Sequence, residues 1–462
     1  MSNYDFILKS LNLKDDSVIF NEIPFTELII KGVRSFVYHA KLIGKPDFCE
    51  QCGVVYENHN MISKGYSKPS MIKLPKVSGF NTYLELTKQR YHCKECGSSF
   101  TKRTRLVNKY CFISNNTKIS IVNSFSLKIS EKDIAQINNV SPSTVKIAID
   151  RIDSDKKIYK HSLPKVMGFD EFKSVKSADG AMSFIYCDLE KKNIIDIVED
   201  RRLFKLKNHF SYYSTEAKEN VETIVIDMYT PYIQLIKSTF PNAKIVIDRF
   251  HIVQHLSRSF QKTRIQVMKK FNTKSTEYRL YKKHWRLFTT KESKLSSSLY
   301  RRWWRDSKQM NQKDFLNHLL TLDDSLYKSY WLYQSFLKAI ENNDIKKIKE
   351  ILELDLGDYP EPIQKAVKTF RSFLPYIINM LESEYNNGFV EGVNNLIKVI
   401  KRISFGYRSF DNFRRRILIT KQIIDIKKLA HTTWVEPVKH YCHWEFMMWP
   451  PTFDLEPLKG RD

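Results

Sequence analysis

The chain has 462 residues, of which 42% are hydrophobic and 13% aromatic, enough for two to four well-packed domains. Its 76 lysines and arginines exceed 51 aspartates and glutamates, a net charge of +25 that favours a polyanionic partner. The start shows no signal peptide, and no apolar run reaches the roughly 18 to 20 residues that span a membrane. We therefore expect a cytoplasmic protein with no membrane partner.

Two CxxC pairs follow in the N-terminal part, Cys49 with Cys52 and Cys93 with Cys96. Each spacing lets both thiolates reach one tetrahedral ion, and the glycine after each pair permits a tight turn. We expect a structural zinc ion in a zinc ribbon-like domain over residues 1–108. A thioredoxin-like redox pair is the alternative, but such a pair would not occur twice.

The segment from Ser130 to Asp153 predicts two helices joined by a tight turn. Ser130 with Asp133 resembles a capping box, and Ser141 is placed to cap the second helix. This spacing resembles a helix-turn-helix DNA-binding domain over residues 109–160. The residues expected to face the DNA groove are Ser143, Thr144 and Lys146. A helical hairpin without DNA contacts remains the alternative.

After a linker around residues 156–165, the pattern predicts three strands, a helix, a strand, a helix and a strand. That order is typical of a ribonuclease-H-like domain, in an α/β multidomain chain. In this fold one carboxylate lies on the first strand and a second follows the fourth strand. By position these are Asp170 and Asp227. Asp248 ends the fifth strand and is therefore not the expected second carboxylate.

A third carboxylate should come from a later helix, and Glu391 is the candidate. Glu382 and Glu384 lie nearby and stay as alternatives. Carboxylates suit two Mg²⁺ (or Mn²⁺) ions that activate a nucleophile and stabilise the leaving oxygen in phosphodiester chemistry. Polar and basic residues that follow Glu391 on its helix are expected to contact DNA: Asn394, Asn395, Lys398, Lys401 and Arg402.

The segment between Leu256 and Lys313 carries 17 lysines and arginines against three acids. Aromatic residues interrupt it, namely Tyr278, Tyr281, Trp285, Trp303 and Trp304. Such a segment offers phosphate contacts and flat surfaces for unpaired bases. For any single aromatic residue, a place in a helical core is the better interpretation.

Several motifs together resemble the DDE transposases of bacterial insertion sequences, specifically the ISL-three group. They are "YHCKECG", "DIAQINNVSPSTVK", "GFDEF", "DMYTPYIQLIKSTFPNAKIVIDRFHIVQ" and "NNGFVEGVNNLIK". The resemblance covers the chain from about Cys49 to Leu418 in the family's order. It implies a catalytic domain over residues 161–430, an all-helical insertion over about 256–385, and a C-terminal tail over 431–462 that matches nothing.

The resemblance also implies roles for the site residues. Asp170, Asp227 and Glu391 would form the metal-binding triad, and Asp248 with His251 would support the active site. The partners would be the terminal inverted repeats and target DNA, bound near the bacterial nucleoid by at least a homodimer. A non-catalytic DNA-binding regulator and a structure-specific nuclease are the alternatives. His251 and His255 have the spacing of a helical metal site, but no third ligand is evident.

Overall fold

The computed structural model describes residues 5–154, 161–305, 307–421 and 456–457, which form a mixed α/β protein. The linker expected around residues 156–165 and the tail over 431–462 lie largely outside these residues. The chain divides into two compact units. One comprises Met1–Ile158, Val175–Ser177 and Leu396–Asp462, and the other Tyr159–Ser174 and Ala178–Asn395. None of the described helices is long and apolar enough to cross a membrane.

The first unit begins with a short helix and an extended sheet. The order of its strands is β12-β1-β2-β5-β3, and β4 and β6 also pair with β5. The elements are α1 Asp5–Ser10, β1 Val18–Ile30, β2 Val33–Leu42, β3 Met61–Tyr66, β4 Ser70–Val77, β5 Phe80–Cys93, β6 Ser99–Thr101 and β12 Glu456–Pro457.

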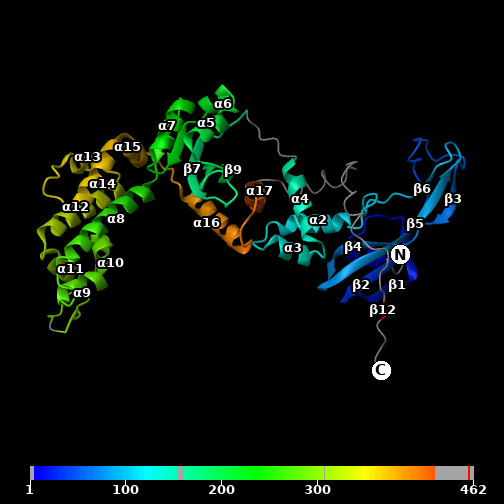
Figure 1. Cartoon of the computed structure of the whole chain (residues 1–462), viewed down its shortest axis with the longest axis horizontal. Coiled ribbons are helices and arrows are strands. Elements are labelled where there is room, and N and C mark those ends of the chain that lie inside the picture. Colours follow the sequence, from blue (N-terminus) through cyan, green and yellow to red (C-terminus); the bar gives the residue numbers. More distant parts are fainter. Residues whose placement is uncertain (1–4, 155–160, 306, 422–455, 458–462) are drawn as a thin grey trace. The chain divides into compact units, whose positions relative to one another are not determined.

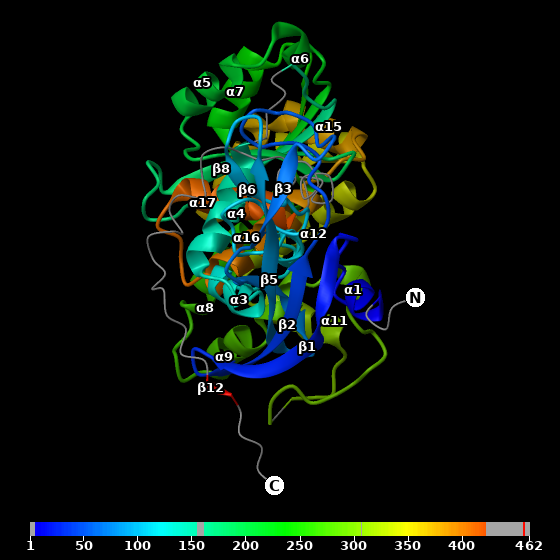
Figure 2. The same cartoon turned by 90° about the vertical axis from the view of Figure 1, so that its right-hand side faces the viewer.

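Strand β5 joins two parts of this sheet (Figure 2). Its first half pairs in parallel with β2, and its second half pairs antiparallel with β3 and β6. The first half belongs to an apolar core that includes Leu42, Leu74 and Leu84, while the second half leads directly to Cys93. The N-terminal part is therefore more than the expected zinc ribbon, because long strands before Cys49 build a separate core.

Three helices follow the sheet: α2 Asn115–Ser124, α3 Glu131–Ile137 and α4 Pro142–Ser154. The turn between α3 and α4 is left-handed at Asn139, where φ is 51°. A fourth helix, α17 Phe410–Thr420, packs into the same core, with Ile419 buried among residues of the other three helices. Residues 410–420 thus belong to this helical cluster, although the sequence assigned them to the catalytic domain.

The second unit contains a five-stranded sheet in the order β11-β10-β7-β8-β9. Strands β7, β10 and β11 are parallel, whereas β8 and β9 are antiparallel to their neighbours. The strands are β7 Val166–Lys173, β8 Met182–Asp188, β9 Asn193–Val198, β10 Thr223–Ile226 and β11 Lys244–Ile247. The order of the strands along the chain is the expected one, but two helices rather than one lie between β9 and β10.

Helices α5 Leu203–Ser211, α6 Thr215–Glu219 and α7 Thr230–Thr239 accompany this sheet (Figure 1). The sequence predicted one helix near Tyr213–Asn220 and missed α5, which has no side-chain cap at its first turn. Buried aromatic rings fill the space between α5 and the sheet, among them Phe169, Phe184 and Phe210.

An all-helical segment follows β11, as expected. Its helices are α8 Arg249–Met268, α9 Thr276–Lys283, α10 Trp285–Thr289, η1 Glu292–Lys294, α11 Gln312–Leu320, α12 Asp324–Glu341, α13 Ile345–Glu353, α14 Glu361–Ser372 and α15 Leu374–Glu382. Helix α8 starts directly after β11, so the segment begins before residue 256. Helix α16, Gly388–Ile403, carries Glu391.

Candidate active site

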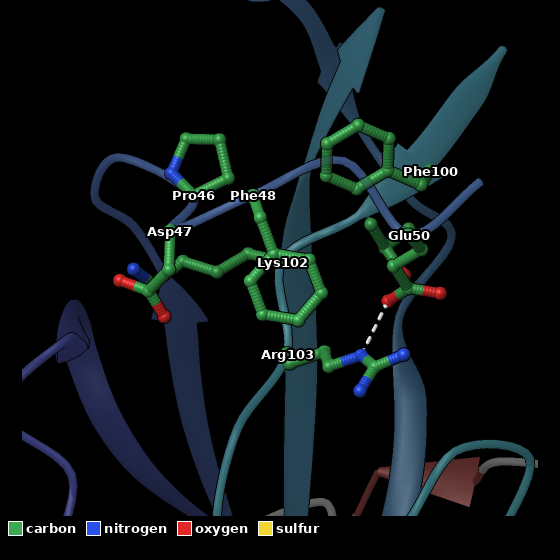
Figure 3. A pocket seen from close by; sticks show the side chains of 8 residues that line it. Pro46, Asp47, Phe48, Glu50, Phe100, Lys102 and Arg103 are labelled. Atoms are coloured by element: carbon green, nitrogen blue, oxygen red, sulfur yellow. Dashed lines mark hydrogen bonds and ion pairs between the residues drawn. The ribbon is translucent and has the colours of Figure 1, made fainter. Parts of the chain in front are cut away.

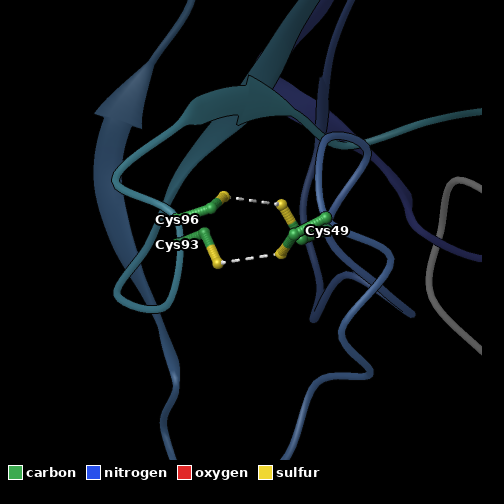
Figure 4. Close-up of side chains that lie close together, drawn as sticks. Cys49, Cys93 and Cys96 are labelled. Atoms are coloured by element: carbon green, nitrogen blue, oxygen red, sulfur yellow. Dashed lines mark hydrogen bonds between the residues drawn. The ribbon is translucent and has the colours of Figure 1, made fainter.

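The four predicted zinc ligands lie together at the end of β5 (Figure 4). The Sγ atoms of Cys49 and Cys96 are 3.7 Å apart, and those of Cys52 and Cys93 are 3.8 Å apart. Four thiolates at about 2.3 Å from one zinc ion would be separated by about 3.8 Å. The cysteine cluster therefore fits a tetrahedral zinc ion.

The backbone around each cysteine pair is preorganised for an ion. The residue after each pair, Gly53 or Gly97, has positive φ and donates its N–H to the first cysteine of that pair. Burial would raise the pKa of the Cys49 thiol, but hydrogen bonds from Ser98 and the backbone lower it to about 6. A lowered pKa favours the thiolate form that binds zinc.

Glu50 ties the first cysteine pair to the segment that follows β6. Its carboxylate accepts hydrogen bonds from Arg103 Nε at 2.8 Å (Figure 3) and from Lys109 Nζ at 2.6 Å. Since Glu50 follows Cys49 directly, these ion pairs help to fix the first cysteine pair.

The carboxylates of the second unit meet at one edge of the sheet. Val225 of β10 pairs with Gly168 of β7, and Ile226 pairs with Ile247 of β11. Extending this register by one or two residues brings Asp227 level with Asp170 on one side and Asp248 on the other. The sheet therefore gathers all three aspartates on adjacent parallel strands.

His251 completes the closest group. Its Nε2 atom lies 3.0 Å from Asp227 Oδ1, and ligand atoms of Asp227, Asp248 and His251 all lie within 4.8 Å of one another. The hydrogen bond to Asp227 and the neighbouring carboxylates raise the pKa of His251, although burial opposes them. His255, one turn later on α8, packs instead on Phe370 and is outside this group of described residues.

Asp170 is not part of this closest group, but the charge of Asp227 acts on its carboxyl group. Burial, and after it the negative charge of Asp227, raise the pKa of Asp170 to about 7. Burial likewise raises the pKa of Asp248, whose Oδ1 accepts the backbone N–H of Asn387 at 3.2 Å. Carboxylates that repel one another in a buried site fit a place for divalent cations.

The surroundings of one carboxylate oxygen support the same interpretation. Asp227 Oδ1 is buried and lies 3.0 Å from His251 Nε2, and no other donor among the described residues reaches it. Hard oxygen ligands of this kind are those that Mg²⁺ and Mn²⁺ prefer. The donor set therefore fits a divalent metal ion.

Helix α16 approaches β7 closely and is fixed there by two asparagines. Asn387 Nδ2, just before the helix, donates to the backbone oxygen of Phe169 at 3.0 Å. Asn394 Nδ2, about two turns later, donates to Asp170 Oδ2 at 2.7 Å. A methyl group at Gly168 would lie 2.6 Å from Asn387 Oδ1, so a glycine there permits this approach.

The position of Asn394 corrects one prediction. The sequence placed its side chain on a DNA-facing surface, but Asn394 is only 8% exposed and bonds to Asp170. The polar and apolar pattern of the helix could not reveal that its partner is Asp170 on β7. Of the other predicted DNA contacts on this helix, Asn395, Lys398 and Arg402 are exposed and Lys401 is half-buried.

Glu391 lies on α16 between the two asparagines and is half-buried. Residues three or four positions apart share one side of a helix, so Glu391 shares the side that carries Asn387 and Asn394. Its alternatives, Glu382 and Glu384, are both exposed, and Glu382 pairs with Lys244 at 2.8 Å. Among the described residues, Glu391 is not part of the closest carboxylate and histidine group.

Glu171, next to Asp170, belongs to a network that the sequence did not reveal. It forms an ion pair with Arg201 and accepts a 2.8 Å hydrogen bond from the hydroxyl of Tyr232. The Arg201 guanidinium lies over the ring of Tyr229, 4.8 Å from its centre. Adjacent acidic residues in "GFDEF" were the available signal, and the network holds the loop after Asp227 to β7.

The helical cluster of the first unit has the predicted local features. Ser130 and Asp133 form a reciprocal capping box. Ser143 and Lys146 are exposed on α4, while Thr144 is half-buried, with its hydroxyl 2.9 Å from Ser141 Oγ.

The aromatic residues of the basic segment separate into core and surface. Tyr281 and Trp303 are buried, with Trp303 stacked on Phe315. Trp285 is 43% exposed, with Arg286 over its ring. Most of the predicted stacking surfaces are therefore partly or wholly used in the helical core.

Comparisons with known proteins show that the chain is similar to transposases. Residues 167–417 match the ISL3 model of DDE transposases, described as "Transposase". Residues 45–96 match a model described as zinc-finger of transposase IS204/IS1001/IS1096/IS1165. The transposase for insertion sequence element IS1001 from Bordetella parapertussis is 23% identical over 392 residues, which cover 83% of this chain and 91% of that protein.

Two further similarities cover a short part of the chain or have a low TM-score. A Lactococcus lactis subsp. lactis protein named ATP-dependent protease is 41% identical over 110 residues, but these span 24% of this chain and 35% of that protein. The Drosophila P element transposase strand transfer complex has a TM-score of 0.36 and 13% identity, covering 69% of this chain and 94% of that chain. Because the transposase model covers more than half of the sequence, the chain belongs to the ISL3 family of transposases.

Proposed function

We propose that the protein cleaves the ends of an insertion sequence and joins them to target DNA, with Asp170, Asp227 and Glu391 as the catalytic carboxylates. The observation that carries this proposal is the register of β7 and β10, which brings Asp170 and Asp227 side by side at the ends of adjacent parallel strands. Helix α16 lies next to them, with Asn394 hydrogen-bonded to Asp170. The strand order β11-β10-β7-β8-β9 supports a ribonuclease-H-like catalytic domain, where carboxylates converge at this edge.

The carboxylates would hold two divalent ions, Mg²⁺ or Mn²⁺, which activate water or a 3′-hydroxyl and stabilise the leaving oxygen. The protein's own contribution is geometric. Asn394 fixes the carboxylate of Asp170, and His251 orients Asp227. Asp248, which accepts the N–H of Asn387, holds the start of α16 in place and so supports Glu391.

DNA recognition is assigned to the first unit and to α16. The capped helices α3 and α4 support a helix-turn-helix domain, with Ser143, Thr144 and Lys146 toward the groove. We propose that it binds the terminal inverted repeats together with the zinc-bound N-terminal domain, residues 1–108. On α16 the phosphate contacts are Asn395, Lys398, Lys401 and Arg402.

We propose the remaining domain limits on the same basis. The helix-turn-helix domain spans residues 109–160 and is completed by α17, and the catalytic domain starts at residue 161. Pairing of two element ends requires at least a homodimer on DNA.

The decisive experiment is strand transfer with labelled element ends and Mg²⁺. It compares the wild-type protein with Asp227→Asn, Asp248→Asn and Glu391→Gln. Loss of activity in the Asp227 and Glu391 variants, with partial activity in the Asp248 variant, is expected. Activity in Asp227→Asn together with none in Asp248→Asn would show that the second catalytic carboxylate is Asp248. Sequence-specific DNA binding by wild-type protein without any cleavage would instead identify a regulator.

A further inference from the structure

The turn between α16 and α17 carries an aromatic side chain that contacts almost nothing in the protein. Phe405 is 98% exposed, and no other large hydrophobic side chain in the described residues is as exposed. Large aromatic residues normally contribute to folding by burial. Packing therefore does not account for a phenylalanine at this position.

The backbone does not account for it either. Phe405 has a φ of 51°, in the left-handed region that glycine and asparagine adopt readily and other residues rarely do. It follows the last turn of α16, where glycine is the usual residue in this conformation. Both observations, one on packing and one on conformation, indicate that the ring serves an interaction outside the fold.

Hydrogen bonds and ring packing fix the turn between α16 and α17, so the ring of Phe405 projects from the protein in a defined position. The backbone N–H of Phe405 donates to Arg402 at 3.2 Å, and that of Gly406 donates to Lys401 at 3.3 Å. Ser404 Oγ lies 3.1 Å from the hydroxyl of Tyr407, whose ring packs on Phe413 with centres 5.0 Å apart. Side chains on both sides of Phe405 therefore anchor the turn.

The charges around the ring define its partner. From Leu396 to Arg415 the sequence has six lysines and arginines and one acid, Asp411. Lys398, Arg402 and Arg408 are exposed. Cations attract phosphates, whereas an apolar ring needs a flat apolar surface to cover it. Nucleic acid offers both, and a duplex presents base faces only where bases are terminal or unstacked.

We propose that Phe405 inserts against a terminal or unstacked base of the DNA held by Arg402 and Arg408, and so opens the duplex at that base step. This inference rests on the proposed DNA-processing function. Apolar wedges flanked by cations open base steps at modest cost, because the DNA gains backbone contacts in return.

The test uses the full-length protein and element-end duplexes that carry 2-aminopurine at single positions around the cleavage site. Wild-type protein should raise the fluorescence at one or two positions, because unstacked 2-aminopurine is brighter. Phe405→Ala should lose at least ~3-fold of that rise, while its DNA affinity falls less than ~5-fold because the cations remain. Phe405→Trp, the matched aromatic variant, should keep the signal.

Two controls separate a wedge from a structural role. Phe405→Gly should melt at or above the wild-type temperature, since the side chain packs on nothing and glycine suits the conformation. On a duplex mismatched at the responding position, the 2-aminopurine signal with Phe405→Ala should lie within ~3-fold of that with wild type, because the base is already unstacked.

The outcomes also separate this inference from the proposed function. An unchanged 2-aminopurine response in Phe405→Ala overturns the wedge even if cleavage is normal. A loss of DNA-free self-association in that variant, with an unchanged DNA response, assigns the ring to a second copy of the chain. If wild-type protein unstacks DNA but never cleaves it with Mg²⁺, the proposed function fails and the wedge stands.

Discussion

The side-chain amide of Asn394 donates a 2.7 Å hydrogen bond to Asp170 Oδ2, and so links the helix of one proposed metal ligand to another. The amide also lies 3.3 Å from the backbone oxygen of Glu171. Together with Asn387, this buried side chain holds α16 against β7. Removing it should disturb both Asp170 and Glu391.

We expect Asn394→Ala to lower the rate of DNA cleavage by roughly 10- to 100-fold, the usual effect of losing a partner of a metal ligand. The apparent affinity for Mn²⁺ should fall by a similar factor, measured by titrating cleavage with the metal. Asn317→Ala, which removes an exposed amide from α11, is the matched control and should behave as wild type. Equal Mn²⁺ titrations for Asn394→Ala and wild type would contradict the role of this bond.

The raised pKa of Asp170 predicts how stability depends on pH without metal. Folded Asp170 titrates at about 7, whereas an unfolded aspartate titrates at about 3.9. Between these values the folded chain keeps a proton that the unfolded chain releases, so the free energy of unfolding falls as pH rises from about 4 to about 7. The raised pKa of Asp248 acts in the same direction over this range, and the raised pKa of His251 lowers stability further only above about pH 6.5.

Thermal melts in EDTA should therefore show a decline on the order of 4 kcal/mol over this range. Asp170→Asn should flatten the part of the decline that belongs to Asp170. Mg²⁺ or Mn²⁺ should raise the melting temperature above pH 7 and have little effect at pH 5, because metal ions bind the ionised carboxylates. A metal effect that is equal at both pH values would argue against Asp170 as a ligand.

The cysteine cluster predicts one tightly bound zinc ion per chain. Metal analysis of the purified protein should give about one equivalent, and Cys93→Ser should abolish it and destabilise the N-terminal domain by several kcal/mol. Cys111→Ser removes a cysteine outside the cluster and should retain the zinc. Zinc retained in Cys93→Ser would rule out the four-cysteine site.

Arg416 predicts that α17 is an integral part of the first unit. It is 1% exposed, donates to the backbone oxygens of Leu127 and Ile129 at 3.0 Å, and lies over the ring of Phe125. Arg416→Ala should cost about 3 kcal/mol, because it empties the space of a buried side chain and removes the donor of two partly buried carbonyls.

Urea unfolding of the full-length protein measures this loss, with the exposed Arg408→Ala as the stability control. Comparable midpoints for the two variants would show that α17 contributes little. A fragment of residues 109–160 should also unfold at lower urea than the same fragment joined to residues 408–421, since Ile419 is part of its core.

Local patterns predicted the elements that local physics determines. The spacing of the cysteine pairs, the capping box of Ser130 with Asp133, and the strand that ends before Asp227 all depend on a few neighbouring residues. Helix α5 was not predicted because Arg202, at its start, forms no side-chain capping hydrogen bond that would mark the helix in the sequence. Its signal was only the apolar pair Leu206 and Phe210.

The contacts that were missed join residues far apart in the chain. Asn394 reads as a polar residue on an amphipathic helix, and its partner Asp170 is separated from it by 224 residues. The salt bridge from Arg415 to Asp150 joins α17 to α4 across 265 residues. Periodicity reports which side of a helix is polar, but not which distant group will meet it.

The helix α17 also has a consequence for the order in which the protein becomes functional during synthesis. The helices α2, α3 and α4 leave the ribosome early, yet their core includes Ile419. The backbone oxygens of Leu127 and Ile129 also lack their donor until Arg416 has been synthesised. Domains usually fold from the N-terminus as they emerge. Here the proposed DNA-binding helices reach their final stability only after every proposed catalytic residue has been made, so we expect a chain truncated before α17 to compete poorly for the ends of the element.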